Sequence, residues 1–104
     1  MDVILARIQK QARTLALRVT QHAQIEMDNE EITLDEVLIA IAYGQILEDY
    51  SEHKRGPCCL LYGRTNEGRP LHIVCTTAQP LLVIITVYEP LLPKWVSPTQ
   101  RRER

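Results

Sequence analysis

The length, composition and charge of the chain exclude several classes of protein. With 104 residues it has the size of a single domain, and with 45% apolar residues it can bury a core, which excludes intrinsic disorder. A formal net charge of -1 lacks the basic excess of most nucleic-acid binders. Any such function must therefore depend on a local cluster of positive charge.

The sequence shows neither a membrane-spanning segment nor a disulfide framework. No apolar run approaches the roughly 20 residues of a membrane helix, and Asp2, Arg7 and Lys10 are unlike the start of a signal peptide. The three cysteines include the adjacent Cys58 and Cys59 and lack the paired spacing of a zinc site. We expect a cytoplasmic protein with reduced, buried cysteines and with no metal, cofactor or membrane contact.

The first half of the chain has the apolar spacing of helices. Residues 2–19 carry one apolar stripe, and Thr20 is placed to cap a second, short helix. Thr33 and Glu36 form a T-x-x-E capping box, and the apolar face behind it runs to Gly44, a residue suited to ending a helix. The sequence thus predicts three helices.

From residue 45 onward the period changes to that of strands. Four segments bounded by turn residues are predicted as strands, at 45–50, 58–65, 69–77 and 81–88. We predict one α+β domain over residues 1–104, in which about three N-terminal helices pack on a four-stranded antiparallel β-meander. Its parts are a first helix (1–19), a core (20–95) and an irregular tail (96–104).

Hairpin geometry places polar side chains of this meander in one row. Pairing about the turn before the third strand puts Tyr62 opposite His72, and pairing about the turn before the fourth puts His72 opposite Thr86. Directly opposed residues share a face, with Cβ atoms about 4.5–5.5 Å apart. Arg64 and Tyr88 fall two residues away on the same face. The sequence therefore predicts a candidate site on this face.

Two histidines admit a catalytic and a structural interpretation. His72 could transfer protons beside a bound phosphate, or it could be hydrogen-bonded to Thr86 or Tyr62 under the helices without any chemistry. His22 lies near a helix start, where the positive end of the dipole favours the neutral imidazole of a general base. It could equally be a boundary residue between helix and sheet.

A basic loop precedes the second predicted strand. Lys54 and Arg55 lie on a turn, and the forked guanidinium of Arg55 is well shaped for a phosphate. The alternative is an exposed, solubilising turn. His53 beside them is interpreted as solvated surface.

Six short motifs in a fixed order resemble those of the prokaryotic DUF4258 domain family. They are His22, Ala23 and Met27; Ile32, Thr33, Glu36 and Val37; Gly44, Glu48, Asp49 and Tyr50; Lys54, Arg55, Gly56 and Pro57; residues 68–74; and residues 84–90, with Lys94 and Trp95 closing the series. The resemblance runs from about residue 20 to residue 95. One position departs from it, because Glu26 stands where the family often has Arg.

The resemblance implies a fold, an activity and a partner. DUF4258 domains are similar to RelE-like and barnase-like ribonucleases of bacterial toxin–antitoxin pairs. That similarity implies a RelE-like architecture, metal-independent RNA cleavage and an antitoxin partner, often a small zinc-finger protein. The positions that it carries over are His22, Arg55, His72, Thr86 and Tyr88.

As a nuclease, the protein is expected to catalyse attack of a ribose 2′-hydroxyl on the adjacent phosphate, which leaves a 2′,3′-cyclic phosphate. This reaction needs a base, an acid and a cation at the phosphate. The expected catalytic residues are His22, His72, Thr86 and Tyr88, and the expected RNA- and phosphate-binding residues are Lys54, Arg55, Tyr62 and Arg64.

A non-catalytic function stays open beside the nuclease. In that interpretation the sheet face and the arginine-rich edges bind an antitoxin or a second copy, and the histidines are structural. A degenerate family member that keeps only the fold is a further alternative. A small gene overlapping this one would favour the toxin.

Overall fold

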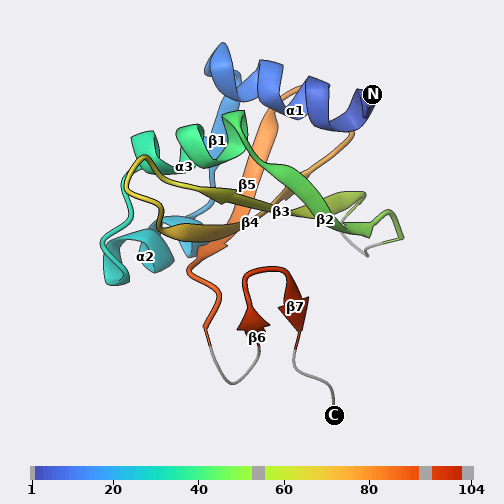
Figure 1. The fold of residues 1–104 in the computed structure, drawn as a ribbon. Coiled ribbons are helices and arrows are strands. Elements are labelled where there is room, and N and C mark those ends of the chain that lie inside the picture. The colour runs from blue at the N-terminus through green and yellow to red at the C-terminus, as the bar shows by residue number, and fades with distance from the viewer. Residues whose placement is uncertain (1, 53–55, 92–94, 102–104) are drawn as a thin grey trace.

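The structure of the protein is a computed structural model that describes residues 2–52, 56–91 and 95–101. Its helices and strands are, in chain order, α1 (Val3–Arg13), β1 (Leu17–Val19), α2 (Gln21–Asn29), α3 (Leu34–Ala42), β2 (Gln45–Tyr50), β3 (Cys58–Arg64), β4 (Pro70–Thr76), β5 (Leu82–Tyr88), β6 (Trp95–Ser97) and β7 (Gln100–Arg101). The predicted α+β class is confirmed. Figure 1 shows α1 and α3 on one side of the main sheet and the β6–β7 hairpin on the other.

The first helix is shorter than the sequence predicts. The prediction of one helix over 2–19 is wrong beyond Arg13, because Leu15 takes a left-handed conformation with φ 58° and turns the chain. The residues that follow form β1, in which Leu17 pairs with Leu82 of β5. The apolar spacing of this segment suits a helix, but in the structure Leu17 and Val19 pack half-buried against the core from a strand, while Leu15 is exposed.

The caps of the other two helices agree with the sequence. The Thr20 side chain accepts a hydrogen bond from the third residue of α2 and donates one to the Ile85 carbonyl (3.1 Å), which fixes the start of α2 on β5. Thr33 and Glu36 form the predicted capping box of α3. This helix ends before Gly44, as predicted. No helix in the described residues is long and apolar enough to cross a membrane.

The main sheet has five strands in the order β1-β5-β4-β3-β2. The four predicted strands are present and neighbouring pairs are antiparallel. The prediction of a four-stranded antiparallel sheet is wrong, however, because β1 adds a parallel edge strand to β5. The sheet is therefore mixed, and β6 and β7 form a separate two-stranded hairpin.

The core lies between the helices and one face of the sheet. Its buried residues are Ile8, Ala12, Ala23, Met27, Ile32, Val37, Ala40, Ile41, Cys59, Leu61, Leu71, Ile73, Cys75, Leu82, Ile84 and Val87. The three cysteines of the chain are free and buried, as predicted. Gly63 of β3 lies directly under Ala40 of α3, where a side chain would not fit.

The C-terminal residues cover part of the opposite face. The sequence predicts an irregular tail here, but residues 95–101 form the β6–β7 hairpin. The hairpin is held because Trp95, only 2% exposed, packs on His72 of the sheet. This face, opposite α1 and α3, carries the predicted site residues of the strands.

Candidate functional site

The predicted row of polar side chains exists, with one change of register. Tyr62 pairs with His72, as predicted. His72 pairs with Tyr88 and not with Thr86, which lies opposite Val74. The β4–β5 turn shifts the register by one residue, and a bulge at Ile85 shifts it by another. Since the total shift is two residues, Thr86 stays on the predicted face. We call Tyr62, His72 and Tyr88 the covered row.

His72 is fully buried within this row. Its Nε2 lies 2.6 Å from the Pro98 carbonyl, which can only accept, so Nε2 donates; Nδ1 is hydrogen-bonded to the Tyr88 hydroxyl at 3.2 Å. Its ring packs edge-on against the Trp95 ring, with 4.3 Å between the ring centres. The alternative that places His72 under the helices is wrong, and its hydrogen bonds reach Tyr88 and Pro98; the interpretation of a structural His72 stays open. The hairpin, on the opposite face, surrounds it instead.

The residues that flank His72 also have partners, although Tyr62 and Tyr88 are only half-buried. Burial raises the pKa of Tyr88. The Tyr62 ring packs edge-on against the His72 ring, with 6.2 Å between the ring centres. Arg64 stacks over Tyr62 at 5.7 Å and donates to the Gly68 carbonyl at 2.7 Å, so it lies by the β3–β4 turn. In this conformation the hairpin covers His72, the centre of the row, while Tyr62 and Tyr88 are half-buried.

An ion pair fastens the hairpin to β2. Arg101 donates to Glu48 through Nε (2.6 Å) and Nη2 (2.7 Å), and its guanidinium lies 4.6 Å from the centre of the Trp95 ring. The hydroxyl of Tyr50 also donates to Glu48. The hydrogen bonds from Arg101 lower the pKa of Glu48 to about 2. The pKa of Tyr50 is raised to about 12, mainly by burial and next by its hydrogen bond to Glu48. We call Glu48 and Arg101 the latch.

We expect acid to release the hairpin. The pKa of Glu48 falls from 4.5 to about 2 on folding, so its contribution is fully present above pH 4.5 and is lost as the pH falls through about 2. The groups that set this pKa are Arg101, Tyr50 and His72. Trp95 is the only tryptophan, so its emission should move to longer wavelength in that range.

Glu48→Gln is the control for this titration, because it lacks the carboxyl and should show no transition in that range. Far-UV circular dichroism separates release of the hairpin from unfolding of the domain. Wild-type emission that stays constant down to pH 2 would contradict the expectation.

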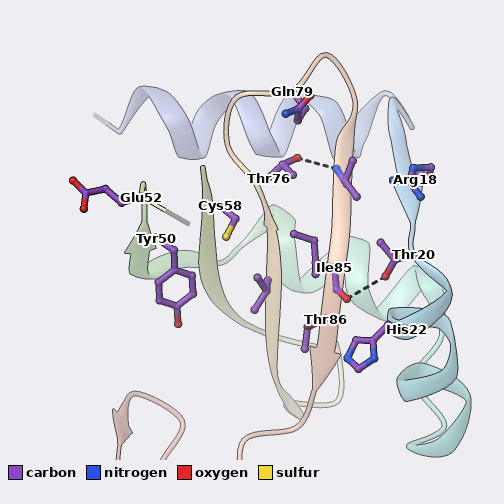
Figure 2. A pocket seen from close by; sticks show the side chains of 12 residues that line it. Arg18, Thr20, His22, Tyr50, Glu52, Cys58, Thr76, Gln79, Ile85 and Thr86 are labelled. Atoms are coloured by element: carbon purple, nitrogen blue, oxygen red, sulfur yellow. Dashed lines mark hydrogen bonds between the residues drawn. The ribbon is translucent and has the colours of Figure 1, made fainter. Parts of the chain in front are cut away.

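Beside the covered row the same face is open. A groove of about 1200 Å³ is lined by Arg18, Thr20, His22, Tyr50, Glu52, Cys58, Val74, Thr76, Gln79, Val83, Ile85 and Thr86. Figure 2 shows the His22 ring beside Thr86, with Arg18 and Thr20 on the same side and Tyr50 and Glu52 across the groove. We call this space the open groove. It brings together His22 and Thr86, two of the predicted catalytic residues.

A carboxylate backs the imidazole of His22. His22 Nε2 lies 3.4 Å from Glu26 Oε1, and that oxygen also accepts from the Val87 backbone N–H at 3.0 Å. The His22 side chain is 67% exposed, so solvent and ligands can reach it. A carboxylate anchored on β5 thus orients an accessible imidazole at the wall of the open groove, the arrangement of a general base.

The open groove offers few other reactive groups. Burial raises the pKa of the Cys58 thiol, which keeps it protonated and a poor nucleophile. Arg18 is exposed at the groove wall and can meet an anion. Among the described residues, no three His, Cys, Asp or Glu side chains come together to hold a metal ion.

The structure therefore divides the predicted site residues into groups. His22 and Thr86 line the open groove, whereas Tyr62, His72 and Tyr88 form the covered row. Arg64 lies over the Tyr62 ring, beside the β3–β4 turn. Lys54 and Arg55, together with His53, lie outside the described residues.

Sequence reasoning missed Arg18, Glu48 and Trp95. Arg18 was assigned to the first helix, although the alternation of Leu17, Arg18 and Val19 also fits a strand. Glu48 and Trp95 occur in the motifs of the family resemblance, but nothing local shows that the hairpin joins them.

Comparison with known proteins gives one match. The model of the family described as "Domain of unknown function (DUF4258)" matches residues 19–89, more than half of the chain. No curated protein and no solved structure matches. The matched segment holds the covered row and most of the open groove, while Arg18, α1 and the β6–β7 hairpin lie outside it.

Proposed function

Since the chain belongs to the DUF4258 domain family, we propose that it is the ribonuclease toxin of a bacterial toxin–antitoxin pair, with the open groove as its RNA site. The proposal includes a likeness of this family to RelE-like and barnase-like ribonucleases, with helices followed by a sheet. The observation that carries it is the accessible His22, backed by Glu26, at the wall of the open groove.

In the proposed reaction His22 is the general base. It takes the proton of a ribose 2′-hydroxyl, whose oxygen then attacks the adjacent phosphorus, while the bond from phosphorus to the 5′-oxygen breaks. The products are a 2′,3′-cyclic phosphate and a 5′-hydroxyl, which takes its proton from water because His72 is covered. The positive charge of Arg18 stabilises the negative charge of the phosphate, and the Thr86 hydroxyl donates a hydrogen bond to a phosphate oxygen.

The charge of the groove sets how RNA binds. Its lining has two cationic or titratable basic groups, Arg18 and His22, opposed by Glu52. Each phosphate contact with single-stranded RNA contributes a slope of about -0.7 to the dependence of log affinity on log salt. We therefore propose that RNA affinity depends only weakly on salt concentration, as expected for one or two phosphate contacts.

The test uses purified protein with total RNA and with translating ribosomes. We expect shortened RNA with 2′,3′-cyclic phosphate ends, and slower growth of a bacterial host after induction. RNA that stays intact in both samples, with unchanged growth, would contradict the ribonuclease. An antitoxin of the small zinc-finger type, encoded beside this chain, is the proposed partner, and the cytoplasm is the proposed location.

A non-catalytic interaction module is the second candidate. The observation in its favour is that both ring nitrogens of His72 are occupied within the covered row. In this interpretation the open groove binds a protein segment and His22 is a surface residue. Tight binding of an antitoxin together with intact RNA would favour this candidate.

A further inference from the structure

The open groove and the covered row are parts of one continuous surface. Thr86 of the groove and Tyr88 of the row are two residues apart on β5, and Val74 and His72 are two residues apart on β4. Residues two apart on a strand share a face. The β6–β7 hairpin, seated on His72, is what separates the two parts.

The hairpin is attached to this surface by few groups. It forms its own two-stranded sheet and does not join the ladder of the five-stranded sheet. A two-stranded hairpin is at best marginally stable alone, so its position depends on its contacts with the domain. Among the described residues, these contacts include the latch, a hydrogen bond from Arg101 to the Tyr50 hydroxyl (3.3 Å), the hydrogen bond between His72 and the Pro98 carbonyl, and the packing of Trp95.

The surface under the hairpin is rich in flat rings. Tyr62, His72 and Tyr88 lie side by side across three strands, and Trp95 of the hairpin now packs on the central ring. Successive bases of single-stranded RNA stack on such rings, while its backbone meets cations. Arg18 and His22 lie along the same face, in the open groove.

We infer that the C-terminal hairpin is a detachable plug over part of the RNA site, held there by Trp95 seated edge-on against His72. This inference rests on the proposed function. With the hairpin seated on His72, RNA can bind only in the open groove. Opening the latch exposes the covered row, and a longer stretch of single-stranded RNA then binds.

The test reverses one charge of the latch. Arg101→Glu sets two carboxylates against each other, and it should increase quenching of Trp95 by acrylamide and move its emission to longer wavelength. Binding of a labelled oligouridine, measured by anisotropy, should tighten about tenfold, which is the effect of stacking one base.

Two controls isolate the latch. The swap Glu48→Arg with Arg101→Glu restores the ion pair and should return both readouts to those of the wild type. Arg13→Glu makes the same charge change at the exposed end of α1 and should leave Trp95 buried. Circular dichroism verifies that each variant is folded.

The failures have different patterns. If Arg101→Glu leaves Trp95 protected, or exposes it without tightening the binding seen with the wild type, the plug is wrong and the proposed function stands. If oligouridine binds neither the wild type nor the opened variant, the plug is wrong, and the proposed function is decided by the cleavage of total RNA and of RNA on translating ribosomes.

Discussion

Gly63→Ala is expected to lower the free energy of unfolding by about 3 kcal/mol or more, at the upper end of the cost of overpacking. A Cβ at this position would lie 2.0 Å from the Ala40 carbonyl oxygen, 2.6 Å from its carbon and 2.9 Å from its Cα. All three atoms belong to the backbone of α3, so no flexible side chain can move aside. The helix and the strand must separate, which opens the core between them.

Neither α3 nor β3 can move away from the added Cβ without breaking other contacts. α3 is fixed by its capping box and by the buried Val37 and Ile41, and β3 is paired on both edges. A small domain has a total stability of only about 5–15 kcal/mol, so the variant should be unfolded well below the wild-type denaturant midpoint.

Gly68→Ala is the matched control for the missing Cβ. Gly68 has a φ of 86° and nothing within 4 Å of an added Cβ, so this variant carries backbone strain without a clash. We expect it to cost about 1 kcal/mol. Urea unfolding followed by circular dichroism measures both. A Gly63→Ala variant no less stable than Gly68→Ala would contradict the close approach of α3.

His22→Gln is expected to reduce kcat for RNA cleavage by about 10²–10⁴-fold, the usual contribution of a general base. Glutamine keeps the size and polarity of the side chain but cannot take up a proton. RNA affinity should change little, because the phosphate is held by Arg18 and Thr86 in the proposed complex. The loss should therefore appear in kcat and not in KM.

Gln21→Ala is the control on the neighbouring, exposed position of α2 and should keep full activity. His72→Ala should behave differently from both, because it removes the seat of Trp95 and acts on hairpin position and stability. An active His22→Gln protein would assign the chemistry to another group. An inactive one with weakened RNA binding would assign His22 to binding.

Local interactions let the sequence determine several parts of this protein. Thr20 and the pair Thr33 and Glu36 reveal the starts of α2 and α3, since a cap bonds to backbone within three residues. The short turn after β3 fixes the pairing of Tyr62 with His72.

Part of the candidate site was also predictable. The alternation of the strands places His72, Thr86 and Tyr88 on one face even when the register shifts by two residues. His22, next to a cap, is placed correctly at the start of α2. Arg18 was missed, because a periodic helix pattern extends through it and outweighs the short alternation of Leu17, Arg18 and Val19.

The tertiary structure decided what depends on contacts between distant residues. The segment of Arg18 is a strand because β5, more than sixty positions later, offers it a backbone partner. His72 is covered because Pro98 and Trp95 return to it, and the latch joins Glu48 to Arg101. No local pattern encodes such contacts, since the energy of each depends on where the rest of the chain has folded. The sequence therefore determined which side chains share a face, and the tertiary structure decided which of them a ligand can reach.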